Sequence, residues 1–487
     1  MNKTLSLLIL ICLIFAAVAS FRLDLRVVTD ESWLCVPAYS LLSSGVPKMT
    51  IFRGADDGSD RLDLGSPLQG PLLAATFKVF GFGLEQGRAL SLLFGLLAIL
   101  GTFLLARQLY DDRVALAAAA LIAADNFFFL AARTIRGEIF LTAFLLFSVY
   151  FLLSGFRRGG SLRFLLSGVF AGLAFLAHPN AIIGLAALFF IMLAENGRAV
   201  FTRRSSWLCL AGAVIAILPY AIFVLVLTYP DKFYFITGQY LVGSRMGPVF
   251  GPGWLWHSLR GELFDRYADL IAFPYRFHVF MTAIAALAYT LANRKKADRF
   301  LLIMVVTWLV LLWLIIVNKT ARYTTAFAPY LWILVAAVLI RAAEKGRELV
   351  RWGAFGLIGL LVASQLAGNL LFFRLYAGSG YRQLAARIRR IVPPAAAIYG
   401  PTTYWLALYD HVYYGSEKVP FTKARSRFRP QVYIIGAREF SEGREYHGLS
   451  RRRALQAEIK DYLDKNGRLI GQLNNAFYGK LRFYAVD

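Results

Sequence analysis

Long apolar runs separated by short polar connections dominate this chain. A helix needs about 20 apolar residues, each rising 1.5 Å, to cross about 30 Å of hydrocarbon. About eleven runs approach that length, which predicts a polytopic helical membrane protein. They fall near 4–21, 88–106, 114–132, 138–155, 162–177, 181–194, 207–228, 276–292, 300–317, 323–341 and 351–373. Because the two runs within 162–194 are short, that region predicts either two spans or one span plus a re-entrant piece.

Lys and Arg between the runs predict the orientation, since short cytoplasmic loops carry the positive excess. With the N-terminus in the cytoplasm, every second loop is basic. These inner loops contain Arg107 and Arg113; Arg157, Arg158 and Arg163; Arg198, Arg203 and Arg204; Arg294, Lys295, Lys296 and Arg299; and Arg341, Lys345, Arg347 and Arg351. An odd number of spans then places the C-terminal part on the outer, periplasmic side of the inner (plasma) membrane.

The first run also has features of a cleavable signal peptide. It follows Met1-Asn2-Lys3 and ends in the small residues Ala17-Val18-Ala19. We expect it to be retained as the first span, because the chain stays hydrophobic throughout. Cleavage would leave the following residues on the same outer side.

Composition agrees with a membrane protein. The 487 residues are 58% hydrophobic, and the mean hydropathy is +0.56, which is too apolar for a soluble fold. The formal net charge of +24 comes from the basic loops and a basic tail, for which anionic lipid headgroups are the natural neighbours. No basic patch lies on a recognisable nucleic-acid module, so we expect no nucleic-acid partner. Cys12 and Cys209 lie in predicted spans, and no disulfide framework is expected.

The pattern divides the chain into a membrane unit, 1–376, and a small soluble α/β unit, 377–487. An outer loop, 21–87, contains two amphipathic stretches that predict helices lying in the membrane interface. A second outer loop, 229–275, is rich in aromatic residues, Gly and Pro, which is typical of a lid or binding loop. After 377, strand-like runs such as Val432–Gly436 alternate with helical stretches.

Charged residues at the predicted outer ends of spans are the candidates for chemistry. Carboxylates and cations that meet at a membrane rim suit a reaction that activates a hydroxyl and expels a phosphate. The set consists of Asp30 and Glu31 after the first span, Arg133, Arg136 and Glu138 in the turn before the fourth, His178 after the fifth, and Lys319 and Arg322 after the ninth.

Each member also has a purely structural explanation. Arg133 and Arg136 would reach lipid phosphates by snorkelling. Glu138 would be stabilised at a helix N-terminus. His178 would end a helix before Pro179.

These pieces together resemble the GT-C membrane glycosyltransferases, in particular the group of protein O-mannosyltransferases and aminoarabinose transferases acting on lipid A. The matching segments are Asp30-Glu31 after the first span, Gly65-Ser66-Pro67-Leu68 through Phe80-Gly81, the turn from Arg133 to Glu138, and the soluble C-terminal unit. The ordered set is more specific than any single motif.

The resemblance implies transfer of a sugar from a polyprenyl-phosphate donor to an acceptor hydroxyl at the outer face, with inversion at the anomeric carbon. Asp30 would be the general base, and Glu31 would position a substrate or Asp30 itself. Glu138 would be a further carboxylate beside an oxocarbenium-like transition state. Arg133, Arg136, His178, Lys319 and Arg322 would bind the donor phosphate. The acceptor stays open among lipid A, another glycolipid, an envelope glycan and a protein.

Two positions depart from the family pattern. Many relatives have a lysine where this chain has His178, and Asp is frequent where it has Glu138. No metal ligand set is evident. A divalent cation as cofactor therefore stays open, since some GT-C enzymes bind one through acids of the outer loops.

Two other classes of protein compete with the enzyme. A transporter or flippase for a lipid-linked sugar also needs many spans, but it places ionisable residues near the bilayer midplane and shows internal symmetry. A noncatalytic scaffold would use the outer loop or the basic tail to bind a partner. Charges at span ends favour the enzyme.

Overall fold

The computed structural model describes residues 3–53, 67–227, 253–267, 276–293, 295–316, 320–436 and 449–486. Within these residues every predicted apolar run is helical. The runs correspond to α1 (Lys3–Ser20), α4 (Leu84–Leu109), α5 (Asp112–Ala124) with α6 (Asn126–Ala132), α7 (Gly137–Arg158), α8 (Ser161–Ala177), α9 (Ala181–Asn196), α10 (Arg204–Leu227), α14 (Phe277–Asn293), α15 (Lys296–Ile315), α16 (Ala328–Lys345) and α17 (Glu348–Leu375). The region 162–194 forms two separate helices, α8 and α9.

Seven of these helices are long and apolar enough to cross a membrane, and the bent pair α5–α6 would be an eighth. Helices α8 and α14 are apolar but have only 17 residues each. The prediction of a multi-pass, mainly helical membrane protein is confirmed, whereas the count of eleven spans stays a prediction.

The predicted run 114–132 is broken rather than continuous. Helices α5 and α6 meet at an angle of 68°. Asp125 lies at the break, where its side chain caps α6 by accepting a 2.9 Å hydrogen bond from the Phe128 amide. The other carboxylate oxygen lies 3.4 Å from Arg276 and accepts a 3.3 Å hydrogen bond from Trp332. A capping aspartate within an apolar run therefore causes the bend.

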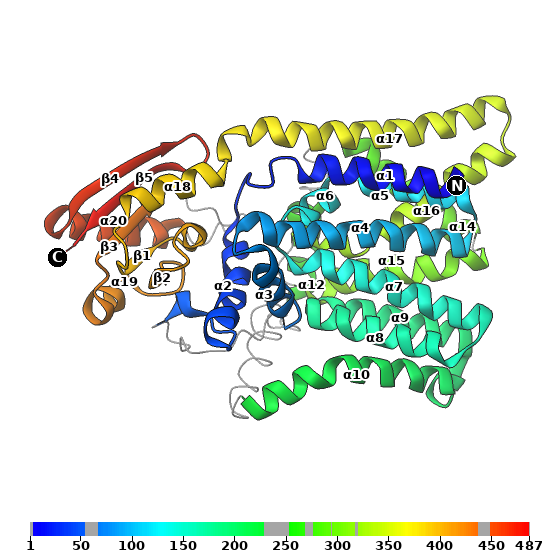
Figure 1. Cartoon of the computed structure of the whole chain (residues 1–487). Helices are drawn as coiled ribbons and strands as arrows, with labels where there is room; N and C mark the ends of the chain where they lie inside the picture. Colours follow the sequence, from blue (N-terminus) through cyan, green and yellow to red (C-terminus); the bar gives the residue numbers. More distant parts are fainter. Residues whose placement is uncertain are drawn as a thin grey trace.

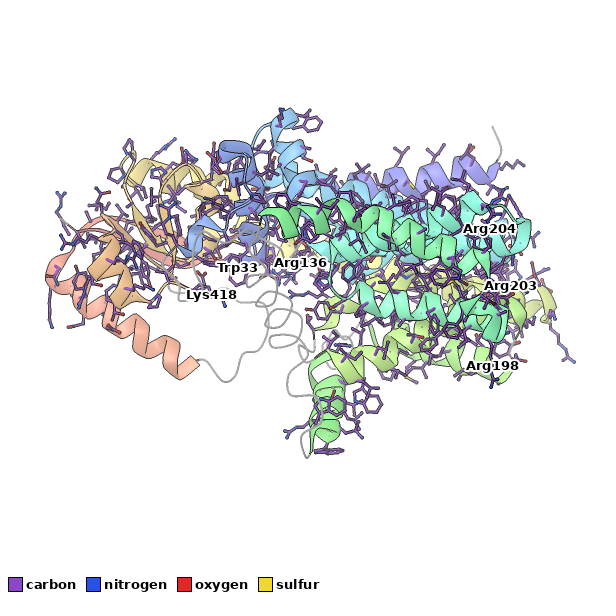
Figure 2. All side chains as sticks on the ribbon, turned by 90° about the horizontal axis from the view of Figure 1, so that it is seen from below. Trp33, Arg136, Arg198, Arg203, Arg204 and Lys418 are labelled. Carbon is purple, nitrogen blue, oxygen red and sulfur yellow. The ribbon has the colours of Figure 1, made fainter. Side chains whose placement is uncertain are left out.

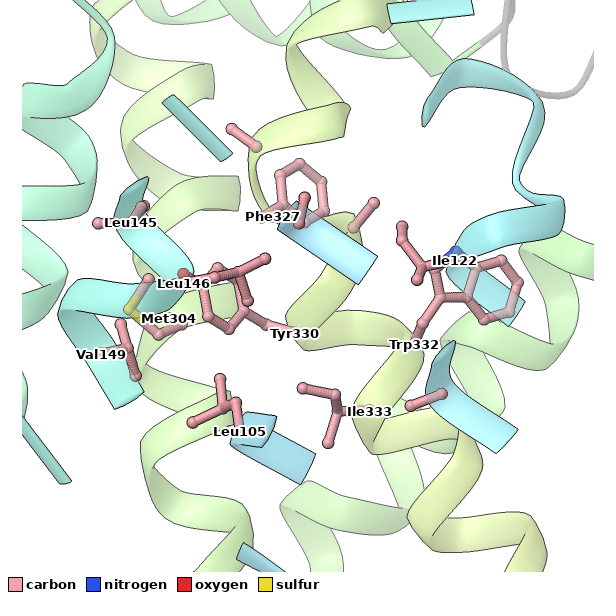
Figure 3. Packing of buried hydrophobic residues seen from close by; sticks show 14 of the residues in the cluster. Leu105, Ile122, Leu145, Leu146, Val149, Met304, Phe327, Tyr330, Trp332 and Ile333 are labelled. Atoms are coloured by element: carbon pink, nitrogen blue, oxygen red, sulfur yellow. The ribbon is translucent and has the colours of Figure 1, made fainter. Parts of the chain in front are cut away.

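The membrane bundle has one large hydrophobic core. Figure 3 shows its centre, where Leu105 of α4, Ile122 of α5 and Leu146 of α7 pack against Tyr330 and Ile333 of α16. All five side chains have no exposed surface. Dense packing of this kind fixes how the helices lie against one another, and therefore where their ends lie.

Two helices of the first polar loop cross one end of the bundle. These are α2 (Thr29–Ser44) and α3 (Gln69–Phe80), and Figure 1 shows them between the long helices and the C-terminal unit. A short 3₁₀ turn, η1 (Thr50–Phe52), lies between them in the chain. Most of the predicted lid, 229–275, lies outside the described residues; the described part is α12 (Trp254–Gly261) and the π-helical η4 (Glu262–Tyr267).

The C-terminal unit contains a five-stranded sheet with strand order β2-β1-β3-β5-β4. Strands β2 and β3 are both parallel to β1, while β5 is antiparallel to β3 and β4. The predicted strand at Val432–Gly436 is β3. The unit comprises η7 (Ala377–Ser379), α18 (Tyr381–Ile391), β1 (Ile398–Gly400), η8 (Thr402–Ala407), β2 (Tyr413–Gly415), α19 (Phe421–Lys423), η9 (Ala424–Phe428), β3, α20 (Leu449–Asn466), β4 (Arg468–Asn475) and β5 (Gly479–Ala485).

The C-terminal unit and the first polar loop share a second hydrophobic core. Cys35 and Val36 of α2 and Leu73 of α3 belong to the same buried cluster as Trp405 and Leu408 near η8. Helices α2 and α3 are therefore packed against the C-terminal unit as well as against the bundle. Where the chain divides into domains stays a prediction.

The charges predicted for the two sides of the membrane lie at opposite ends of the bundle. In Figure 2, Arg198, Arg203 and Arg204 lie at one end, whereas Trp33 and Arg136 lie at the end that carries the C-terminal unit. This separation agrees with the predicted topology, although which end faces the cytoplasm stays a prediction.

Helices α8 and α10 approach each other closely through glycine. A Cβ atom on Gly168 would lie 1.9 Å from the Cys209 carbonyl oxygen, so Gly168→Leu should force the two helices apart. We expect the variant to lose about 1–3 kcal/mol of stability. Thermal inactivation in lipid nanodiscs measures the loss. Gly356→Leu is the control, because nothing lies within 4 Å of a Cβ at that position of α17. Equal effects of the two substitutions would contradict this packing.

Candidate active site

The acidic pair begins α2, and its two side chains point to different surroundings. Neighbouring residues of a helix point about 100° apart, so one member of a pair can be buried while the other stays accessible. The Asp30 side chain is 36% exposed, whereas the Glu31 side chain is fully buried. The two carboxylates of the acidic pair therefore lie in different environments.

Glu31 forms a buried ion pair with Arg88 of α4. Arg88 donates to both carboxylate oxygens, from Nε over 2.7 Å and from Nη2 over 2.5 Å. Its other donor positions bind the carbonyl oxygens of Leu23, Leu25 and Arg26, at 2.5–3.0 Å. Every N–H of the guanidinium thus has a partner, which is what a buried arginine requires.

Glu31 also binds two backbone amides. It accepts hydrogen bonds from Val28, at 3.1 Å, and from Ile135, at 3.0 Å. Ile135 immediately precedes Arg136, so this carboxylate connects the start of α2 to the turn before α7. Glu31 is enclosed by protein and adjoins Asp30, which favours its predicted role of positioning Asp30; both predicted roles of Glu31 stay predictions.

Asp30, Arg136, Glu138 and Arg322 come together as a cluster of four charges. Arg136 lies 2.8 Å from Asp30 and 3.3 Å from Glu138. Arg322, in η6 (Ala321–Ala326), lies 3.7 Å from Asp30 and 3.4 Å from Glu138. Each arginine bridges the same two carboxylates, so the four formal charges cancel. Residues far apart in the sequence therefore form one site, which we call the four-charge cluster.

The four-charge cluster is open on one side. The Glu138 side chain is only 4% exposed and the Arg136 side chain 11%, whereas Arg322 is 22% and Asp30 36% exposed. Substrate can therefore reach Asp30 and Arg322 more readily than Glu138. Ion pairs in such a partly water-excluded place are stronger than at a free surface.

His178 lies behind Glu138. A Cβ on Gly137 would lie 2.7 Å from the Ala177 carbonyl oxygen, so the start of α7 closely approaches the end of α8. The His178 ring is 7% exposed, and its Nδ1 accepts a 3.1 Å hydrogen bond from the Asn180 amide. When the ring is neutral, its proton is therefore on Nε2. The structure thus places His178 beside the cluster.

Arg133 does not join the four-charge cluster. Its guanidinium donates to the carbonyl oxygens of Ala19, Phe21 and Arg22 at the end of α1, and its side chain is 2% exposed. The rings of Phe129, Phe372 and Phe373 lie within 4.8–5.4 Å of it. Backbone and aromatic contacts hold Arg133 in this structure, and its binding to the donor phosphate stays a prediction. Lys319 lies outside the described residues.

A mainly apolar cavity of about 240 Å³ lies within the bundle, and the buried pair Asp125 and Arg276 forms part of its wall. Thr324 of η6 lines it, two residues after Arg322. The rest of the wall comes mainly from α14, α15 and α16, through residues that include Val279, Leu309 and Leu331. Among the described residues, no group of three His, Cys, Asp or Glu side chains could hold a metal ion. Dependence on a divalent cation stays open.

The fold as a whole matches solved membrane enzymes. ArnT from Cupriavidus metallidurans, both without ligand and bound to undecaprenyl phosphate, superposes with a TM-score of 0.67. The alignment covers 98% of this chain and 97% of that one, at 15% identity. This chain has the fold of the GT-C glycosyltransferases.

Two further comparisons agree with the GT-C fold. The oligosaccharyltransferase AglB from Archaeoglobus fulgidus, in complex with an inhibitory peptide and a dolichol-phosphate, matches with a TM-score of 0.54 at 15% identity. That match covers all of this chain and 74% of the other. The sequence model of the dolichyl-phosphate-mannose-protein mannosyltransferases matches residues 65–223. A comparison with curated proteins gives no match.

Arg88 is a site residue that the sequence pattern does not reveal by itself, because it stands at the start of the apolar run 88–106. An arginine that enters an apolar run needs a buried acidic partner. Glu31 is an acid of the polar loop just before that span, so the pairing could have been inferred from the sequence.

Loss of Arg88 should destabilise the GT-C fold strongly. Arg88→Met leaves Glu31 as a buried, unpaired charge, which costs about 3–5 kcal/mol. Arg382→Met is the matched control, because Arg382 also pairs with a glutamate, Glu85, but its side chain is 75% exposed. That change should leave the stability almost unchanged, because exposed ion pairs contribute little. Unfolding midpoints of both variants in nanodiscs check the difference, and a mild effect of Arg88→Met would refute the assignment.

Proposed function

We propose that the chain transfers a sugar from a polyprenyl-phosphate donor to an acceptor hydroxyl at the four-charge cluster. One observation carries this proposal. An accessible carboxylate, Asp30, contacts two arginines that a second, buried carboxylate holds in place. A base beside two cations matches the two needs of the reaction, which are to take a proton from the acceptor and to stabilise a departing phosphate.

Asp30 is the general base in this mechanism. It is the more exposed of the two carboxylates in the cluster, so an acceptor hydroxyl can approach it. As the hydroxyl oxygen attacks the anomeric carbon, Asp30 takes the proton, and the bond from that carbon to the phosphate oxygen breaks. Attack opposite the leaving phosphate inverts the configuration at this carbon.

Arg136 and Arg322 receive the negative charge of the leaving phosphate. A phosphate oxygen leaves as a weak base, so it needs charge stabilisation more than protonation. Without substrate, Arg136 and Arg322 form ion pairs only with the carboxylates of Asp30 and Glu138 within the cluster. With donor bound, they would also form ion pairs with its phosphate. Glu138 keeps both guanidinium groups in position and adds negative charge near an oxocarbenium-like centre.

The apolar cavity suits the lipid part of the donor. Thr324 lines it, and most of its wall consists of apolar side chains of α14, α15 and α16, where prenyl groups would avoid water. The ligands named for the similar structures support this class of donor, since one holds undecaprenyl phosphate and the other a dolichol-phosphate. We propose a hexosyl or pentosyl donor and a location in the inner membrane, with the cluster on the outer side.

A transporter for a lipid-linked sugar would use buried charges inside the bundle. Asp125 and Arg276 are such a pair, both about 6% exposed. However, Asp125 caps α6 and accepts a hydrogen bond from Trp332, so its oxygens serve the helix break. Both residues of the pair also line the apolar cavity. The four-charge cluster differs in offering an accessible carboxylate beside two arginines, and this arrangement favours the enzyme.

Asp30→Asn tests the proposed reaction. The variant should retain donor binding but lose at least about 10²-fold in kcat, because the amide cannot take the proton. Radiolabelled polyprenyl-phosphate sugar and an envelope extract, added to the reconstituted protein, measure the transfer. Asp410→Asn is the control, since Asp410 is an exposed carboxylate of the C-terminal unit. Wild-type turnover in Asp30→Asn would exclude Asp30 as the base.

A further inference from the structure

The C-terminal unit holds the chain segment on both sides of Asp30. Before Asp30, the Arg26 amide donates to Ser379 Oγ over 2.9 Å, and the Val27 amide donates to the Tyr478 hydroxyl over 2.9 Å. Leu25 forms an isolated antiparallel bridge with Gly380. All three contacts join residues about 350–450 positions apart in sequence. An irregular segment that leads into the site is thus fixed from outside the membrane bundle.

Contacts after Asp30 continue the same attachment. The hydroxyl groups of Thr29 and Thr403 lie 3.3 Å apart, and the Trp33 indole donates to Thr402 Oγ1 over 3.0 Å. Glu417, after β2, holds Thr402 in turn by accepting hydrogen bonds from its amide, at 2.9 Å, and its hydroxyl, at 3.0 Å. Trp33 lies one turn of α2 after Asp30, so the orientation of that turn depends on η8.

Tyr478 is one of the fully buried residues that make these contacts. Its side chain is fully buried, in the turn between β4 and β5. Asn475 fixes the turn by accepting hydrogen bonds from the amides of Phe477, at 2.8 Å, and Tyr478, at 2.9 Å. Burial raises the pKa of the Tyr478 hydroxyl well above its ordinary value, so the phenol stays neutral. Val27 is also fully buried, and the Tyr478 oxygen is the acceptor that its amide needs.

We propose that the C-terminal unit positions the catalytic base, and that Tyr478 is the principal positioning residue. Arg88 and Glu31 hold segment 23–31 from the bundle side, while Ser379, Tyr478, Thr402 and Thr403 hold it from the other side. Asp30 stands between these two attachments, facing Arg136. The inference rests on the proposed function for its catalytic consequence, whereas the attachment itself can be measured without any substrate.

Hydrogen exchange of the reconstituted full chain measures the attachment. Tyr478→Phe removes one oxygen and leaves the Val27 amide without its acceptor, so the amides of residues 24–33 should exchange at least about tenfold faster. Tyr433→Phe is the matched control. It removes a hydroxyl from β3 of the same sheet, in a different hydrophobic cluster from the one that contains Tyr478. Exchange in residues 24–33 should not change in that variant.

Kinetics then separate a positioning effect from general damage. Tyr478→Phe should lower kcat for sugar transfer about tenfold and leave KM for the donor within about twofold, because Arg136 and Arg322 are untouched. When Tyr478→Phe is added to Asp30→Asn, it should not lower kcat further, because the carboxylate that Tyr478 helps to position is already absent. Additive losses in the double variant, or unchanged exchange in residues 24–33, would overturn the proposal.

Two further comparisons separate a failure of this inference from a failure of the proposed function. If Tyr478→Phe does not fold, Ser379→Ala is judged by the same exchange and kinetic criteria, because it removes the acceptor of the Arg26 amide. If the wild-type protein transfers no sugar, the proposed function fails. The exchange comparison still decides whether the C-terminal unit holds the acidic segment.

Discussion

The buried ion pair between Glu31 and Arg88 is the constraint on which the site depends. Two opposite charges out of contact with water are stable only when their hydrogen bonds are complete. Here four donors meet the two oxygens of Glu31, and five acceptor contacts meet the guanidinium of Arg88. Because all of these hydrogen bonds must form together, they fix how the start of α2, the start of α4 and the turn before α7 lie relative to one another. Asp30 and Arg136 are the neighbours of the residues so fixed, and they face each other as a consequence.

The membrane bundle supplies the second half of the site. Arg136 and Glu138 begin α7, and Arg322 lies in the turn before α16, so their positions follow from helices packed through the common core. The two arginines and two carboxylates then neutralise one another at the end of the bundle that carries the C-terminal unit. A phosphate bound at this cluster would contact two arginines that are already oriented. The prenyl groups attached to it would occupy the apolar cavity beside η6. Preorganisation of this kind is what stabilises a leaving group most.

Much of this could be predicted from the sequence, because hydrophobic periodicity determines where membrane helices form. The apolar runs, the amphipathic helices of the loop 21–87 and the strand at Val432–Gly436 all follow from local patterns. The bend at Asp125 was missed, because a capping aspartate does not interrupt the average hydropathy of a run. The separation of Arg133 from Arg136 could not be predicted either. They are three residues apart, yet one binds carbonyl oxygens at the end of α1 and the other binds Asp30, and only the packed structure decides this.

The most direct test of the central claim is a structure of the protein in lipid nanodiscs with undecaprenyl phosphate. The account predicts that the phosphate lies within hydrogen-bond distance of both Arg136 and Arg322, that Asp30 faces the open side of the cluster, and that Glu31 remains paired with Arg88. A phosphate bound at the opposite end of the bundle, beside Arg198, Arg203 and Arg204, would contradict it.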